Sequence, residues 1–212
     1  MKSIFFYIYV SRQTMVKLEL YSHQISAQAF LASKEQGKYK GCFLSDEPGM
    51  GKTLTMAYFL KTNKTKMPDM IICPCSVIKT WEREIYRLYE DKKPRVLVYH
   101  GDKRKERFDE DWEYIITTYQ LASTDVCLRR KRYKRIVVDE SHMIRNRCKR
   151  TRNIISLNEI SDFRFCLSAT PFNNRKNDLM LQAMFIGTCP YNEKDWWKNA
   201  TLTQVNEWRQ NN

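Results

Sequence analysis

Residues 42–55 read CFLSDEPGMGKTLT, and the order of residue types in this stretch decides the fold that we expect. A short apolar run, Cys42 to Leu44, predicts a buried strand. A turn that contains Gly49 and Gly51 follows it, and a helix is predicted to open at Lys52. A strand, a glycine turn and a helix in this order are what a phosphate-binding loop requires.

Each part of this stretch has a physical role in such a loop. Glycines let the backbone bend so that consecutive N–H groups point at one anion, and the new helix adds its positive N-terminal end. Lys52 can then reach the β- and γ-phosphates, and the Thr53 hydroxyl can bind Mg²⁺. The general pattern has glycine where this chain has Asp46, so a chance Gly-Lys-Thr in an ordinary turn stays open at this point. The residues expected to contact a nucleotide are Asp46, Glu47, Gly49, Met50, Gly51, Lys52 and Thr53.

Composition narrows the class of protein. The 212 residues fit one domain with a sizeable core, and 37 Lys and Arg against 24 Asp and Glu give a net charge of +13. This charge favours a polyanionic partner, although solubility alone accounts for part of it. No apolar run approaches the roughly 20 residues that span a bilayer, so no membrane role is expected. The seven cysteines are scattered without zinc-ligand spacing, which favours reduced thiols in an intracellular protein.

The chain alternates short apolar runs with helical patterns. Most of the predicted strands are continuous apolar runs, which is typical of a parallel sheet covered by helices on both faces. We therefore expect an α/β fold with ligands at the carboxyl ends of the strands. Ser76 is predicted to cap the helix that follows it. The predicted helices are 18–36, 52–63, 77–88, 121–128 and 178–186, and the predicted strands are 4–10, 42–44, 69–73, 95–99, 114–119, 136–140 and 163–168.

The stretch IVVDESH at 136–142 is the second decisive one. A buried strand delivers Asp139 and Glu140 at its carboxyl end, where Asp139 can hold the water shell of Mg²⁺ and Glu140 can polarise an attacking water. The alternative is that the two acids merely lie at a solvated strand end. The presence of Lys52 and Thr53 upstream makes this alternative the weaker of the two interpretations. Gln24, near the start of the first helix, carries an amide that can pair with the edge of an adenine; alone, it is equally typical of a surface glutamine.

The basic run RRKRYKR at 129–135 has three possible roles: a solvated loop, a contact with phosphates, or a nuclear localisation signal.

These stretches together resemble the first RecA-like lobe of superfamily 2 helicase-type ATPases, and most of all the Swi/Snf-type DNA translocases. Six short matches stand in the family's order and spacing. They are DEPGMGKT at 46–53 (a phosphate loop that commonly lacks the leading glycine), ICPCS at 72–76 with Trp81 and Glu84 (motif Ia), ITTY at 116–119 (motif Ib), DESH at 139–142 with IRN at 144–146 (the DEAH box), LSATP at 167–171 with Asn174 (motif III), and Gln24 at the adenine-reading position.

The resemblance implies a RecA-like P-loop NTPase lobe that uses ATP and Mg²⁺, with Lys52, Asp139 and Glu140 as catalytic residues and Thr53 and Asp139 at the metal. It also implies contacts with the backbone of double-stranded DNA and a coupling between nucleotide and DNA. An ordinary cap, strand threonine or core histidine is the alternative for each of these residues. The expected DNA contacts are Ser76, Lys79, Thr117 and Thr118, and the expected coupling residues are His142, Ser168 and Thr170.

Three departures from the family pattern stand out. Pro48 replaces an apolar residue, which stiffens the loop and removes an N–H donor. Ser141 replaces alanine and should be tolerated. Ser168-Ala-Thr170 replaces the commoner Thr-Gly-Thr, a variant that also fits the compact insect-virus global transactivators of this family.

The resemblance covers residues 17–190, which leaves 1–16 as an extension, with Met15 as an alternative start, and 191–212 as a tail. No stretch resembles motifs IV to VI or the arginine finger, whose contribution to rate is about 10³–10⁵. We expect this chain to be one lobe of an ATP-hydrolysing DNA translocase, completed by a second RecA-like lobe in cis or in trans. We expect it to act inside the cell, in the nucleus (in a host nucleus if the protein is viral). An inactive DNA- or partner-binding relic is the alternative, and an RNA helicase lobe is disfavoured by Trp81 and Asn146.

Overall fold

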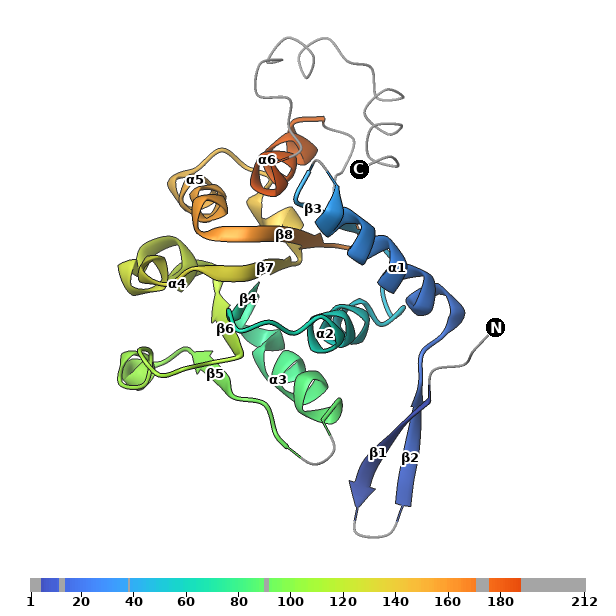
Figure 1. Cartoon of the computed structure of the whole chain (residues 1–212). Coiled ribbons are helices and arrows are strands. Elements are labelled where there is room, and N and C mark those ends of the chain that lie inside the picture. The colour runs from blue at the N-terminus through green and yellow to red at the C-terminus, as the bar shows by residue number, and fades with distance from the viewer. Residues whose placement is uncertain (1–4, 12–13, 38, 90–91, 171–175, 188–212) are drawn as a thin grey trace.

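The computed structural model describes residues 5–11, 14–37, 39–89, 92–170 and 176–187. Its centre is a six-stranded, entirely parallel sheet with the strand order β3-β8-β7-β4-β6-β5 (Figure 1). The predicted α/β architecture with a parallel sheet is therefore confirmed. The strands are β3 (Gly41–Leu44), β4 (Asp69–Cys73), β5 (Val96–Tyr99), β6 (Tyr114–Thr118), β7 (Tyr133–Asp139) and β8 (Ser161–Leu167).

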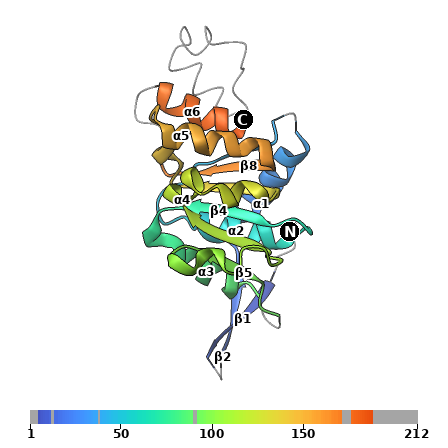
Figure 2. The same ribbon diagram turned by 90° about the vertical axis from the view of Figure 1, so that its left-hand side faces the viewer.

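Helices cover both faces of the sheet, as expected. One face is covered by α1 (Ser22–Gln36), α2 (Lys52–Thr62) and α3 (Ile78–Arg87), and the other by α4 (Tyr119–Thr124), α5 (Lys149–Ile155) and α6 (Lys176–Ile186) (Figures 1 and 2). Short 3₁₀ helices lie at Cys75–Val77, Asp102–Lys105, Val126–Arg130, Ser141–Ile144 and Ser156–Ile160. Among the described helices, none is long and apolar enough to cross a bilayer.

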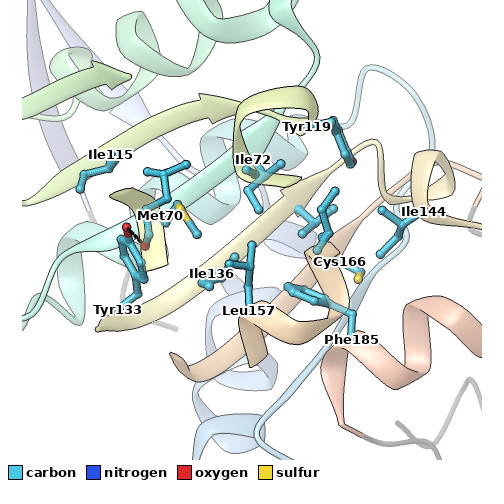
Figure 3. Packing of buried hydrophobic residues seen from close by; sticks show 14 of the residues in the cluster. Met70, Ile72, Ile115, Tyr119, Tyr133, Ile136, Ile144, Leu157, Cys166 and Phe185 are labelled. Atoms are coloured by element: carbon cyan, nitrogen blue, oxygen red, sulfur yellow. Dashed lines mark hydrogen bonds between the residues drawn. The ribbon is translucent and has the colours of Figure 1, made fainter. Parts of the chain in front are cut away.

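The side chains of the central strands explain why their sequences are continuously apolar. In β4, Met70 and Ile72 pack into the cluster under α4, α5 and α6 (Figure 3). Ile71 and Cys73 pack into the cluster under α1, α2 and α3. Successive strand residues point to opposite faces, and both faces here are covered by helices. A strand of this kind buries every residue, so it shows no polar alternation.

An antiparallel hairpin precedes the sheet domain. Its strands are β1 (Phe5–Ser11) and β2 (Thr14–Glu19), and it projects from the main body in both views (Figures 1 and 2). The predicted strand at 4–10 is confirmed, and the second strand runs across the boundary expected between residues 16 and 17. Residues 188–212, which include the expected tail, and Asn174 lie outside the described residues.

The start of α3 differs from the prediction. The residues Cys75–Val77 form a 3₁₀ helix, α3 begins at Ile78, and Val77 occupies its cap position without a side-chain hydrogen bond. The prediction of Ser76 as the helix cap is therefore wrong. Pro74 precedes the 3₁₀ turn and delays the α-helix by one short turn, so Ser76 stays exposed at the carboxyl edge of the sheet.

Candidate functional site

The segment after β3 forms a tight loop over the carboxyl edge of the sheet. The Met50 N–H donates to the Glu47 carbonyl at 3.3 Å, and Gly49 between them has φ 82°. Proline at the second position and a left-handed glycine at the third are the residues that a type II turn favours. Pro48 therefore fits the turn in which it lies, which gives this departure from the family pattern a structural reason.

The Lys52 side chain folds back over this loop. Its Nζ donates to the carbonyl oxygens of Asp46 at 2.7 Å and Glu47 at 3.0 Å. Gly51, with φ 79° and ψ 29°, precedes the first turn of α2, where Thr53 is half-buried. The loop thus presents a lysine amine, a hydroxyl and the positive end of an eleven-residue helix to one place.

The first turn of α1 lies directly against the loop. Gln24 is 2% exposed, and its Oε1 accepts a hydrogen bond from the Tyr21 N–H at 3.0 Å. Gly51 has φ 79°, which favours glycine, and a Cβ there would lie 2.6 Å from Gln24 Nε2, so a side chain would also displace the Gln24 amide. A hollow of about 630 Å³, lined among others by Tyr21, Gln24, Leu54 and Arg87, opens beside the amide. Its position suits a flat base next to the loop.

The carboxylate of Asp139 lies at the end of β7 and is 7% exposed. Its Oδ2 accepts the Trp81 indole N–H at 2.8 Å, and its Oδ1 accepts the Glu140 N–H at 3.0 Å. Burial raises the pKa of this carboxyl above its ordinary value, whereas the Trp81 hydrogen bond and the charge of Lys52 lower it. Leu44, which precedes the loop, and Asp139 both pair in register with Leu167 of β8, so the loop and the acidic strand end share one edge of the sheet.

Glu140 has a backbone conformation that few side chains adopt. With φ 54° and ψ 50° it is the one non-glycine residue with positive φ among the described residues. The Tyr119 hydroxyl, itself buried, donates to the carbonyls of both Asp139 and Glu140, the latter at 3.0 Å. A left-handed non-glycine residue held in this way is typical of functional sites, because its surroundings must fix the strained conformation.

His142 joins the acidic loop to the end of β8. Its Nδ1 lies 3.2 Å from Glu140 Oε2 and 3.3 Å from Ser168 Oγ, and Ser168 Oγ also accepts the Thr170 N–H at 3.2 Å. The three residues expected to couple nucleotide and DNA are therefore linked through Ser168, and His142 connects them to Glu140. Their role in coupling stays a prediction.

Ser141 also has a specific buried partner. Its hydroxyl donates to Gln182 Oε1 of α6 at 2.6 Å, and both side chains are fully buried. The serine that replaces alanine is therefore tolerated because α6 supplies a matching amide.

The four expected DNA contacts divide into two pairs. Ser76 and Lys79 are exposed at the carboxyl edge, as a phosphate contact requires. Thr117 is fully buried and its hydroxyl donates to the Tyr99 carbonyl at 3.1 Å, whereas the Thr118 hydroxyl caps α4 by accepting the Leu121 N–H at 3.3 Å. A fully buried hydroxyl cannot reach a phosphate, so Thr117 is not carried forward as a DNA contact, and Thr118 has the role of a helix cap.

The basic run 129–135 is part of the folded body. Arg129 donates to the Asn153 carbonyl, Lys131 donates to the Glu110 carbonyl at 2.8 Å, and Arg135 is buried in an ion pair with Glu35. These contacts favour a structural role over the phosphate contact or the localisation signal.

The donor set fits a magnesium nucleotide. Mg²⁺ prefers oxygen ligands and is usually held by one or two carboxylates together with substrate phosphates and waters. Thr53 and Asp139 provide a hydroxyl and a carboxylate of this kind. In the described part of the chain, no group of three or more His, Cys, Asp or Glu side chains could hold a metal by itself.

The sequence did not indicate three of the contacts that organise the site. Trp81 and Tyr119 belong to motifs that give no sign of these partners, and Gln182 belongs to no motif, yet each side chain reaches the acidic segment 139–142. A buried polar group needs a hydrogen-bond partner. An indole, a phenol and an amide within apolar patterns are therefore the sequence features that could have indicated these contacts.

Comparison with known proteins gives three consistent findings. Residues 23–212 match the family model described as "SNF2-related domain". The chain is 25% identical over 228 residues to Transcription termination factor 2 of Drosophila melanogaster, covering 86% of this chain and 21% of that protein. It is 33% identical over 178 residues to Helicase SWR1 of Yarrowia lipolytica, covering 78% of this chain and 10% of that protein. The chain thus spans a small part of these relatives.

The fold matches a solved structure as well. The Sulfolobus solfataricus SWI2/SNF2 ATPase core in complex with dsDNA superposes with a TM-score of 0.74 and 27% identity, covering 91% of this chain and 42% of that one. The six-stranded parallel sheet is therefore of the RecA-like type found in that ATPase core.

Proposed function

This chain belongs to the SNF2-related domain family, and on that premise we propose that it is the first RecA-like, ATP-binding lobe of a double-stranded DNA translocase that hydrolyses ATP to move on or remodel DNA complexes. The observation that carries the proposal is the strand register: β3, which leads into the Lys52 loop, and β7, which ends in Asp139, both pair with β8, so that the two groups lie at one edge of the sheet. Residues 17–190 form this lobe in our proposal.

The residues of the site have distinct roles in this proposal. Lys52 exchanges the carbonyls of Asp46 and Glu47 for phosphate oxygens, while Gln24 beside the hollow reads the base. Thr53 and Asp139 would hold Mg²⁺, which when bound neutralises charge on the phosphates. Glu140 orients the attacking water, and positioned groups of this kind supply most of the catalysis in phosphoryl transfer.

The DNA contact is proposed for the exposed residues Ser76 and Lys79, which lie at the same edge as the nucleotide loop. The net charge of +13 favours a polyanion, and the Sulfolobus core was solved with dsDNA. In our proposal a second RecA-like lobe, in cis or in trans, completes the nucleotide cleft, and the chain acts in the nucleus, by analogy with a relative named as a transcription termination factor. The narrower resemblance to viral transactivators stays a prediction.

ATP hydrolysis with and without duplex DNA tests the proposal. We expect DNA to stimulate hydrolysis by the wild type and Lys52→Ala to abolish it, because the amine that meets the phosphates is gone. Lys61→Ala is the matched control, since Lys61 lies on the same helix but donates to the Leu88 carbonyl away from the loop. Nucleotide binding without turnover would favour the inactive relic, preference for single-stranded RNA would favour an RNA helicase lobe, and no nucleotide binding would contradict the proposal.

A further inference from the structure

Trp81 connects two parts of the molecule that are 58 residues apart in sequence. It is fully buried in the cluster between α3 and the sheet, and its indole N–H donates to Asp139 Oδ2 at 2.8 Å. The second carboxylate oxygen is held by the Glu140 N–H. Each oxygen therefore has one donor from the protein, which fixes the plane of the carboxylate and leaves other acceptor positions available.

The helix that carries Trp81 begins at the exposed carboxyl edge. Ser76 and Lys79 are exposed, whereas Ile78, Trp81 and Ile85 form its buried stripe. Lys79 and Trp81 lie within the first turn of one α-helix, which is a rigid unit on this scale. A ligand that moves the exposed side of this turn consequently moves the indole that holds Asp139.

A second connection starts from the end of β6. Tyr119 is the first residue of α4, whose start is capped by the Thr118 hydroxyl. The Tyr119 hydroxyl donates to the carbonyls of Asp139 and Glu140 and so supports the left-handed conformation of Glu140. The side chain of Asp139 is thus held from α3 and the backbone of the acidic segment from α4, separately from the contacts of His142 with Ser168.

We propose that Trp81 and Tyr119 are positioning residues that couple the exposed first turn of α3 and the start of α4 to the magnesium-binding carboxylate of Asp139. A polyanion bound at Ser76 and Lys79 would then change the orientation of this carboxylate through the indole. This inference rests on the proposed function and adds a route between DNA and nucleotide that does not pass through His142 and Ser168.

Trp81→Phe tests the indole, because it keeps an aromatic ring in the core and removes the N–H. Tyr119→Phe tests the second connection and keeps the proposal falsifiable if the first variant is too unstable. Trp112→Phe is the matched control: Trp112 is also buried and donates its indole N–H to a carbonyl, that of Arg107, at 2.7 Å, but it lies before β6 at the opposite edge of the sheet. Thermal unfolding of all three variants measures the structural cost alone.

The readout is the binding of a fluorescent adenine nucleotide at varied Mg²⁺, with and without duplex DNA. Loss of a group that orients a metal ligand usually weakens metal binding 10–100-fold, so we expect both variants to need at least about tenfold more Mg²⁺. We also expect the factor by which DNA changes nucleotide affinity in the wild type to fall close to one. Trp112→Phe should keep the wild-type values.

Two different failures can be told apart in this experiment. If the wild type binds the nucleotide, Lys52→Ala does not, and both test variants still behave like Trp112→Phe, the positioning role is overturned while the proposed function stands. A wild type whose nucleotide affinity DNA leaves unchanged overturns the coupling as well. If the wild type binds no nucleotide, or Lys52→Ala binds equally well, the proposed function itself fails.

Discussion

The two edges of the central sheet each bury an aspartate, but they give it different partners. At the amino edge Asp69 Oδ1 lies 3.5 Å from the guanidinium of Arg135, which also forms a bidentate salt bridge with the Glu35 carboxylate. At the carboxyl edge Asp139 has an indole and a backbone N–H, and no described residue forms an ion pair with it.

This difference indicates what each edge is for. A buried carboxylate beside a guanidinium has a cation of the protein itself as a direct partner, so it serves the fold. A buried carboxylate whose hydrogen-bond partners are neutral has no cation in direct contact, although the charge of Lys52 acts on it, so a cation supplied from outside would stabilise its charged form. Substitutions at the amino edge should therefore change mainly the stability, whereas substitutions at the carboxyl edge should change mainly nucleotide binding.

Arg135→Met should have the largest effect. It leaves Glu35 and Asp69 without their shared cation, and removing one partner from a buried ion network costs about 3–5 kcal/mol. Urea denaturation measures the loss. Combining Arg135→Met with Glu35→Leu and Asp69→Leu should restore most of the stability; a triple variant as unstable as the single one would show that the charges are not the cause.

Ser141→Ala should cost about 1–3 kcal/mol, because it removes the buried donor that Gln182 Oε1 accepts. The double variant Ser141→Ala with Gln182→Leu should cost less than the sum of the two single changes, since the partners are in contact. Thermal or urea unfolding of the cycle checks this. Ser123→Ala combined with Gln182→Leu is the additive control, because Ser123 donates instead to the Gln120 carbonyl. Additivity in the test pair would contradict the structural pairing.

The pH dependence of stability should reveal the weaker contact of Asp69. Burial raises its pKa to about 7, against the opposing effect of Arg135, because the guanidinium fork is directed at Glu35. The folded state then binds more protons than the unfolded state between about pH 4 and 7, so stability falls as the pH rises through this window. In Asp69→Asn this decline should be absent from the unfolding curves; an unchanged decline would assign it to another group.

Asp139→Asn should have the smallest effect on stability and a large one on binding. The amide removes a buried charge, which is favourable, but it loses one of two acceptors, so we expect a net change below about 1 kcal/mol. Nucleotide binding in Mg²⁺ should be lost. Parallel denaturation and nucleotide titration check both parts, and a loss of stability equal to that of Arg135→Met would remove the distinction between the two edges.

The sheet itself was predictable because its strands are apolar throughout. The strand at 69–73 was placed at its observed bounds, and the loop at 46–53 and the acidic pair at 139 and 140 lie at one edge, as the parallel arrangement requires. In contrast, α5 reads KRTRNII and has no clear helical periodicity, so it was not predicted. Its position depends on packing against α4 and α6.

The contacts that shape the site were harder to predict, because they join residues distant in sequence. Thr117 was expected to face DNA, but its strand places it inside and Tyr99 of β5 accepts its hydroxyl. The indole of Trp81 and the left-handed Glu140 likewise follow from how three strand ends meet. Motif spacing finds which residues belong together, whereas donor and acceptor pairing decides which of them remain accessible.

The resting position of the Lys52 amine has a consequence for how tightly any phosphate can be retained. The ammonium group is already solvated by two peptide oxygens, those of Asp46 and Glu47. An arriving anion therefore replaces existing acceptors and does not meet a bare cation, so the net gain in affinity is smaller than the number of new contacts suggests. In the proposed ATPase, the same two oxygens would again accept hydrogen bonds from the amine once the phosphate leaves.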